Sequence, residues 1–304
     1  MPARTSSATR HGGSHRLGLA LVGASTVAWS LAGFFTRLIP LDLWTLLVWR
    51  GIFGALGIAA FVVWMRGRAS LADLRNLGWL GWLYVAVTAG GMVLFLAALR
   101  HTTVAHVSVI YATVPLFAAG LGWLFLRETP SGGALLASLA ALVGVVVMVG
   151  LGREGTLFGD GLAVLTTLSM AGMMVIARRL PEGPAMAAAG LSALLSGVVC
   201  WPLGDPLALT GSNLVLLILF GLVNSALGLA LFTWGARLLP PVESALLGAL
   251  DAPLAPVWVW LAFAEAPSRS TVIGGLLVFA AVGLHIGHSA WTSEVTRAPE
   301  FAEP

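Results

Sequence analysis

The sequence predicts an all-α integral membrane protein with ten transmembrane helices, arranged as two inverted repeats of five helices each. Three observations carry this prediction: the chain is strongly apolar, its apolar runs can cross a bilayer, and its two halves share a pattern. Of the 304 residues, 58% are hydrophobic and only 10% are charged, whereas a soluble domain has about 25% charged residues. A folded soluble protein of this length needs more charged residues than this on its surface, which excludes an ordinary soluble enzyme.

The apolar residues form runs of the length that a helix needs to cross a hydrocarbon core, about 20 residues. Backbone polar groups must be satisfied within lipid, so the spans are either helices or strands of a closed barrel. Barrel strands alternate in hydrophobicity, and stretches such as Leu135–Leu151 do not, so helices are predicted. The ten predicted spans are 17–39, 43–65, 77–99, 103–126, 132–151, 159–179, 184–203, 213–236, 240–263 and 270–290.

The segments outside these spans are short. Residues 1–16 are polar, and we expect them to form a disordered cytoplasmic tail. The first span is longer than the apolar region of a signal peptide, so we expect it to be retained. The predicted organisation is this tail, a first repeat at 17–151, a second repeat at 159–290 and a cytoplasmic C-terminal tail at 291–304.

The arginines predict the orientation of the chain. All 16 basic residues are arginines, and they are scattered between apolar runs, without the clustered basic face that a nucleic acid partner requires. With the N-terminus in the cytoplasm, eleven arginines lie inside and four outside, with Arg50 within a span. The positive-inside rule therefore places both termini in the cytoplasm. We expect a multi-pass protein of the inner membrane of a bacterium.

The two halves of the chain share a sequence pattern that indicates duplication. The string Trp-Leu-x-x-x-Glu-x-Pro-Ser occurs at 123–131 and again at 260–268, 137 residues later. Helices rich in Leu and Ala do not readily match by chance in Trp, Glu, Pro and Ser together. Five spans in each half is an odd number, so the second half enters the membrane from the opposite side. Inverted repeats of this kind recur in secondary transporters, whose substrate site lies near the midplane between the halves.

Several shorter strings extend this pattern. They are Ala-Leu-Arg-His-Thr-Thr-Val-Ala-His-Val at 98–107, Val-Pro-Leu-Phe at 114–117 and Trp-Leu-Phe-Leu-Arg-Glu at 123–128, followed in the second copy by Asp-Ala-Pro at 251–253 and Trp-Leu-Ala-Phe-Ala-Glu at 260–265. With these strings, residues 17–290 resemble the EamA-type family of the drug/metabolite transporter superfamily. The resemblance implies ten spans in two inverted repeats and transport, mostly export, of amino acids, metabolites or toxic compounds. It also implies coupling to protons or by exchange.

The chain departs from the family pattern at two places. Asp251 stands where the family often has Glu-Pro, with Pro253 displaced by one position, and Met170 stands where the family often has Trp. Both changes alter the expected shape of a central pocket, so no relative's substrate is transferred to this chain.

Ionisable side chains within a span are costly and are therefore candidates for function. Asp251 lies eleven residues into its span, about 16 Å deep, where it could bind a cation, carry a proton or make a structural hydrogen bond. Glu243 and its repeat mate His106 each lie about one turn from a boundary, near opposite faces, so we expect no direct pair; snorkelling is the alternative. Arg50, seven residues into the second span, could bind a substrate carboxylate or have the structural role common in the family.

Aromatic, amide and proline residues complete the set of candidates. Trp29, Tyr111 and Trp234 lie in spans that line the family's central cavity, where aromatic walls bind apolar or cationic ligands; simple packing is the alternative. Asn224 in the eighth span could bind substrate or join two helices. Pro115 and Pro253 lie inside spans at nearly symmetric positions, and because proline interrupts helical hydrogen bonding they are candidate hinges.

The sequence argues against an enzyme. It contains no His-Glu-x-x-His zinc motif and no Gly-x-x-x-x-Gly-Lys phosphate loop, and no Gly-x-Ser-x-Gly nucleophile elbow. We expect no metal and no cofactor. The expected partners are a small-molecule substrate and the lipid bilayer, with proton coupling left open, in a monomer or homodimer. The alternatives are a membrane-embedded enzyme or scaffold, and a passive channel.

Overall fold

The computed structural model describes residues 6–67, 69–150, 156–207, 209, 211–264 and 266–295. Within these residues the secondary structure is helical and contains no strand. Ten helices of the described chain are long and apolar enough to cross a membrane: Ser14–Leu38, Leu43–Arg66, Gly78–His101, His106–Leu126, Gly132–Val149, Leu157–Arg179, Glu182–Leu203, Asn213–Ala236, Pro241–Phe263 and Arg269–His288. The predicted fold class is therefore confirmed.

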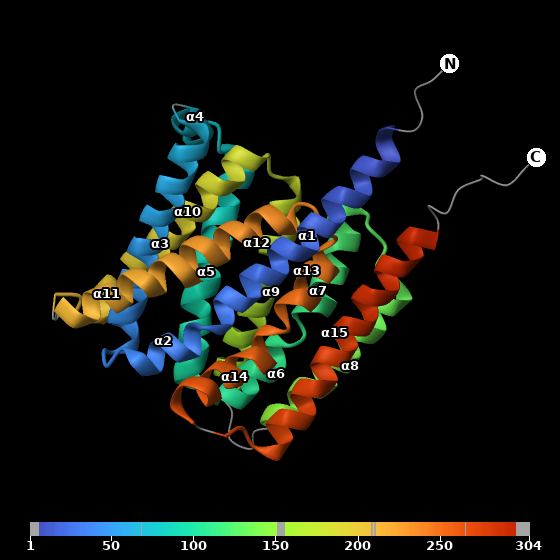
Figure 1. Cartoon of the computed structure of the whole chain (residues 1–304). Coiled ribbons are helices and arrows are strands. Elements are labelled where there is room, and N and C mark those ends of the chain that lie inside the picture. Colours follow the sequence, from blue (N-terminus) through green and yellow to red (C-terminus); the bar gives the residue numbers. More distant parts are fainter. Residues whose placement is uncertain are drawn as a thin grey trace, which may run out of the picture.

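Several spans are built from more than one helical element (Figure 1). The first repeat contains α1 (Ser6–Ser30), α2 (Ala32–Leu38), α3 (Leu43–Arg66), α4 (Ala69–Arg75), α5 (Gly78–His101), α6 (Val104–Tyr111), α7 (Val114–Leu121), the π-helical segment η1 (Gly122–Leu126) and α8 (Gly132–Val149). The second contains α9 (Leu157–Arg179), α10 (Glu182–Cys200), the 3₁₀ turn η2 (Trp201–Leu203), α11 (Gly211–Phe220), the π-helical segment η3 (Gly221–Leu227), α12 (Gly228–Ala236), α13 (Pro241–Gly248), α14 (Asp251–Phe263) and α15 (Arg269–Val295).

The terminal helices extend further than the sequence predicts. Helix α1 begins at Ser6, inside the stretch expected to be a disordered tail, and α15 ends at Val295, beyond the last predicted span. Adding residues to a helix that has already nucleated costs little, because each one gains a backbone hydrogen bond. Residues 1–5 and 296–304 lie outside the described chain.

The duplication is visible in the backbone. Arg127 and Ala264, which are 137 residues apart, end the fourth and ninth spans in the same left-handed conformation, with φ of 58° and 56°. Non-glycine residues rarely adopt positive φ. The recurrence of this uncommon conformation at equivalent positions supports the two-repeat architecture.

The repeats exchange their first spans. Helix α9, the first span of the second repeat, packs against α5, α6 and α7 of the first repeat. Reciprocally, α1 packs against α12, α13 and α14 of the second repeat. We call α5, α6, α7 and α9 the α9 group, and α1, α2, α12, α13 and α14 the α1 group. Each group therefore contains spans from both repeats.

Glycines allow equivalent spans of the two repeats to cross closely. The second spans, α3 and α10, meet where a Cβ on Gly51 would lie 2.6 Å from the Ala193 carbonyl oxygen and 2.7 Å from Gly197 Cα. The fifth spans, α8 and α15, meet where a Cβ on Gly144 would lie 2.8 Å from the Gly274 carbonyl oxygen. Small residues at such crossings let helix backbones approach in lipid.

The two ends of the bundle differ in charge. Helix ends and loops at one end carry Arg66, Arg127, Arg178, Arg179 and Arg237. We call this end the arginine face and the other end the distal face. The N-terminal end of α1 and the C-terminal end of α15 lie together at one end of the bundle (Figure 1), which the chain order identifies as the arginine face.

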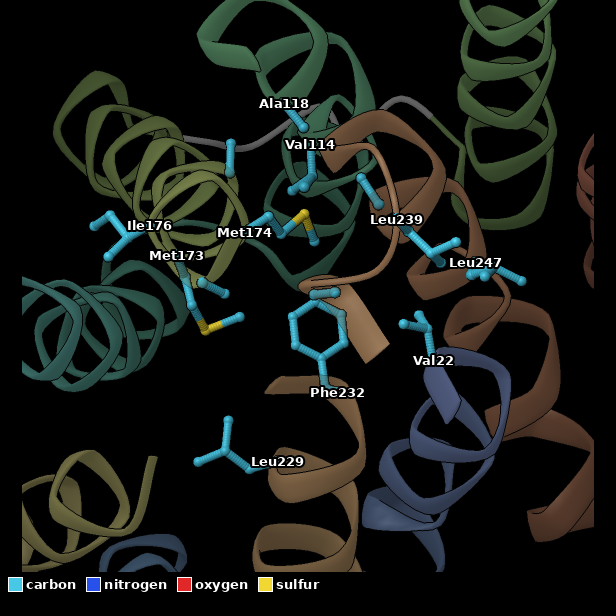
Figure 2. Packing of buried hydrophobic residues seen from close by; sticks show 14 of the residues in the cluster. Val22, Val114, Ala118, Met173, Met174, Ile176, Leu229, Phe232, Leu239 and Leu247 are labelled. Carbon is cyan, nitrogen blue, oxygen red and sulfur yellow. The ribbon is translucent and has the colours of Figure 1, made fainter. Parts of the chain in front are cut away.

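The largest cluster of described buried residues lies mainly towards the arginine face. There, apolar side chains of the α9 group, such as Met174 and Ala118, meet Val22, Phe232 and Leu239 of the α1 group and its adjoining loop in one cluster (Figure 2). Towards the distal face, the buried residues form separate clusters. One of these contains Phe35 and Phe220, and another is confined to the α9 group around Val107. Packing therefore joins the two groups mainly in the arginine half.

Candidate substrate site

The fourth and ninth spans are broken near their middle at symmetric positions. The first half of the fourth span, α6, ends at Tyr111, and the second half, α7, begins at Val114. In the ninth span α13 ends at Gly248 and α14 begins at Asp251. The two intervening residues are 112–113 and 249–250, so the breaks are separated by the same 137 residues as the repeats.

Proline accounts for the position of each break. Pro115 is the second residue of α7 and Pro253 is the third residue of α14. Because proline has no N–H, it leaves the carbonyl four residues earlier without its helical donor; these carbonyls belong to Tyr111 and Ala249. The structure thus places both candidate hinge residues directly after a break.

Arg50 and Asn224 come together near the middle of the bundle. Arg50 Nη1 donates to Asn224 Oδ1 at 3.2 Å, and Nη2 lies 3.5 Å from the sulfur of Met92. Asn224 lies in the π-helical segment η3 and donates to the carbonyl oxygens of Ala28 and Trp29 at 3.2 and 3.1 Å. Segments of π-helix within α-helices are frequent at functional sites. Asn224 therefore joins α3 to α1.

Asp251 and Tyr111 lie at the breaks of the ninth and fourth spans. Asp251 is the first residue of α14, and Tyr111 is the last residue of α6. The Tyr111 ring lies 6.2 Å from the Phe95 ring of α5. One turn along α5 from Phe95 is Met92, which contacts Arg50. The sequence did not single out Met92 or Phe95, because apolar residues in a span carry no chemical signal of their own.

Two other candidates lie in different surroundings. The Trp29 ring packs against the Phe232 ring with 4.8 Å between centroids, next to the Asn224 contact. Trp234 lines a small pocket with Phe61 and Met186, at the arginine end of α3 and α10. Trp234 therefore lies apart from Asp251 and Arg50.

Glu243 and His106 each form an ion-pair contact with a residue of the other repeat. Glu243 Oε2 lies 2.7 Å from His15 Nε2 near the arginine face. His106 Nδ1 lies 3.0 Å from Asp160 Oδ1 near the distal face, and the same oxygen accepts a hydrogen bond from Thr102. Sequence reasoning missed His15 and Asp160, because the pairing follows from the exchange of first spans between repeats.

A model of the EamA-like transporter family matches residues 16–150 and 157–286, which is most of the chain. The chain belongs to the EamA-like transporter family. A solved crystal structure of another protein is similar to this EamA-like chain, with a TM-score of 0.70 and 21% sequence identity. The similarity covers 91% of this chain and 98% of that chain, and it shows the fold. No match to a curated protein was found.

The two family matches divide this EamA-like protein into its two repeats, each with one broken span. Together with the ten apolar helices, membership makes it a multi-pass membrane protein of a transporter family. The breaks, the η3 segment and the unlike charges of Arg50 and Asp251 are therefore the features that a function has to explain.

Proposed function

We propose that this EamA-like protein is a secondary transporter that moves a small molecule by alternating access, with the substrate held between its two halves. The observation that carries the proposal is the pair of symmetric breaks in the fourth and ninth spans. Discontinuous helices at the midplane expose backbone polar groups, which is how many secondary transporters build substrate sites. Two equivalent halves can also exchange conformations and so open the site to each side in turn.

The contacts between the α9 and α1 groups support a state that is closed at the arginine face. Tyr84 of α5 and Thr233 of α12 are hydrogen-bonded through their hydroxyls at 2.9 Å. Arg178 Nη1 donates to the Arg237 carbonyl at 2.9 Å, and Arg237 Nε donates to the Leu180 carbonyl at 2.8 Å. All three bonds lie in the arginine half, where the largest buried cluster also lies. Breaking them is the step that alternating access requires.

By the positive-inside rule, the arginine face is the cytoplasmic face, which puts both termini in the cytoplasm. We assign the protein to the inner membrane of a bacterium and its direction to export, acting as a monomer or homodimer. Asp251, Glu243 and His106 are the proposed proton carriers if transport is coupled to a pH gradient.

The test uses purified protein in liposomes, with counterflow of labelled amino acids, polyamines, nucleosides and cationic dyes. Saturable counterflow is the expected result, because a carrier must bind its substrate on both sides. Flux that rises linearly with concentration indicates a channel, and a covalently changed product indicates an enzyme; either result overturns the proposal. Repeating the assay with an imposed pH gradient separates proton coupling from exchange.

A further inference from the structure

The outer halves of the two broken spans are each held at the same helical position. Glu243 is the third residue of α13, and His106 is the third residue of α6. Glu243 Oε2 lies 2.7 Å from His15 Nε2 of α1. His106 Nδ1 lies 3.0 Å from Asp160 Oδ1 of α9. Each half-helix is therefore attached near its outer end to the first span of the other repeat, and it meets a break at its inner end.

A glycine beside each pair lets the backbones come close. A Cβ on Gly18, three residues after His15, would lie 2.8 Å from the side chain of Leu239, which precedes α13. A Cβ on Gly159, in the first turn of α9, would lie 2.6 Å from the carbonyl carbon of His101 at the end of α5. Small residues at such places allow close contact between helices, so both attachments are supported by packing as well as by charge.

The pair at the arginine face can respond to pH. The exposed fractions of the His15 and Glu243 side chains are 29% and 14%, so His15 can exchange protons with water on that side. Histidine changes its charge close to neutral pH. A protonated imidazole donates a charge-assisted hydrogen bond to a carboxylate, and such a bond is stronger than one from a neutral ring. The attachment of α13 to α1 is therefore stronger when His15 is protonated.

The ionisable groups around α13 include two further histidines, both on α15. Helices α7 and α8, which pack against α13, contain no ionisable residue. Helix α9 contributes Arg178, a like charge to His15, which pairs with Glu128 at 2.9 Å. Helix α15 contributes His285, on which the charge of Glu243 acts and whose Nε2 is buried without a hydrogen-bond partner among the described residues. Arginine keeps its charge at all relevant pH values, so the histidines are the groups that titrate near neutral pH. The other ionisable side chains at this end of the neighbouring helices and loops are Arg16, Arg179, Arg237 and His288.

The position of α13 affects closure of the arginine face. Helix α13 packs against α7 and α9 of the α9 group as well as against α1 (Figure 1). Its buried residues Val242 and Leu246 belong to the same cluster as Ala118 of α7. A movement of α13 about the break at 249–250 therefore changes the contacts that close this face.

We propose that His15 is a positioning residue whose protonated imidazole fixes α13 against α1 through Glu243, and that loss of this proton loosens the outer half of the ninth span. The pair makes closure of the arginine face sensitive to the pH of the solution on that side. The inference goes beyond the proposed function, and its measurement needs no transport substrate. It gives Glu243 a role whether or not transport is coupled to protons.

Hydrogen exchange measured by mass spectrometry on the full-length protein in detergent tests the proposal. Exchange rates at pH 6 and pH 8, on either side of the histidine titration, are corrected for the intrinsic effect of pH on amide exchange. Protection is then compared between residues 241–248 of α13 and 104–111 of α6. We expect protection of α13 to be about fivefold higher at pH 6 than at pH 8, because the hydrogen bond from a charged donor is the stronger one. Protection of α13 that does not vary with pH overturns the proposal.

Two variants of His15 assign the response to this residue. His15→Gln removes the charge, so α13 should show the lower protection at both pH values. His15→Lys carries a positive charge at both, so α13 should show the higher protection at both. A pH response of α13 in His15→Gln as large as in the native protein overturns the assignment.

Control variants separate local positioning from other causes. Asp160→Asn removes the charge that pairs with His106, so it should lower protection of α6 and leave α13 unchanged. His285→Gln and His288→Gln should leave the pH response of α13 intact. Loss of the response in either variant assigns it to α15 and overturns the proposal. An equal loss of protection in α6 and α13 in His15→Gln indicates global destabilisation and also overturns it.

Reversing the pair gives a test that depends on a gain of protection. His15→Glu places two carboxylates together and should lower protection of α13 at both pH values. Adding Glu243→His restores a pair of opposite polarity, like that of His106 and Asp160, and should recover the protection at pH 6 and not at pH 8. No recovery in the double variant overturns the proposed pairing.

Discussion

At the scale of the residue, Asp42 shows how one carboxylate fixes the start of a span. Asp42 precedes α3 on the distal face and accepts hydrogen bonds from the backbone N–H groups of Trp44 and Thr45, both at 3.0 Å. Burial raises the pKa of Asp42, but hydrogen bonds from the Thr45 side chain and from the backbone N–H groups of Thr45, Trp44 and Asp205 outweigh burial and hold the pKa below its ordinary value of 3.8. The folded state therefore favours the ionised side chain.

The ionisation of Asp42 predicts a pH dependence. Because its pKa is lower in the folded state, its contribution to stability is complete above pH about 4 and is lost as the pH falls through the folded pKa. Asp42→Ala should cost about 1 kcal/mol at pH 7, and this difference should shrink towards pH 3. Asp42→Asn keeps a capping side chain and should stay near the native stability at pH 7. Thermal unfolding in detergent between pH 3 and 7 measures both; a difference that does not vary with pH contradicts the prediction.

At the scale of the element, the crossing of α3 and α10 depends on the absence of a side chain at Gly51. A Cβ there would meet backbone atoms of Ala193 and Gly197 at 2.6 and 2.7 Å, and backbone cannot rotate away. Gly51→Ala should therefore destabilise the protein by about 1–3 kcal/mol through overpacking. Gly90→Ala is the matched control, because nothing lies within 4 Å of a Cβ at that helical position. Equal melting temperatures for the two variants would refute the close crossing.

The broken spans give a second prediction at the scale of the element. Pro115→Ala restores an N–H that can bond to the Tyr111 carbonyl and so make the fourth span continuous. We expect the turnover rate in counterflow to fall about tenfold, the effect of about 1.4 kcal/mol on a barrier, with substrate affinity changed less. Pro241→Ala is the control, since proline at the first position of α13 interrupts no hydrogen bond. Full turnover in Pro115→Ala would remove the break from the mechanism.

At the scale of the whole molecule, the hydrogen bond between Tyr84 and Thr233 contributes to closure of the arginine face. Thr233 also donates to the Leu229 carbonyl at 2.6 Å, so Tyr84→Phe leaves the Thr233 proton satisfied. The variant should destabilise the state that is closed at the arginine face by about 1 kcal/mol relative to the open state. This change shifts the equilibrium between the closed and open states about fivefold.

Cysteine labelling measures this shift. Ala118 is fully buried in the arginine half, and the native Cys200 is replaced by alanine to leave Ala118→Cys as the reactive position. Adding Tyr84→Phe should speed its labelling by an impermeant maleimide about fivefold from the arginine face. Asn76→Cys, exposed on the same face, should label at the same rate with and without Tyr84→Phe. An unchanged labelling rate at Ala118→Cys would show that contacts other than the Tyr84–Thr233 hydrogen bond hold the arginine face closed.

Long apolar runs and one repeated string predicted ten spans and two inverted repeats, because length and composition alone decide whether a helix crosses lipid. Arg50, Asp251 and Asn224 were recognisable as candidates, because polar groups within a span are costly wherever their partners lie. Pro115 and Pro253 likewise marked the breaks through a property of the residue itself, the missing N–H.

Only the tertiary structure decided which of these residues meet. The exchange of first spans between repeats brings His15 to Glu243 and Asp160 to His106, and sequence spacing has no signal for contacts across so many residues. The same packing sets Arg50 against Asn224 without an ion-pair partner among the described residues, and it places Trp234 in a pocket with Phe61 and Met186. The sequence gives the type of each side chain and therefore its chemistry. Its partners depend on how the helices pack, so only the folded structure shows which charged side chains lack a partner.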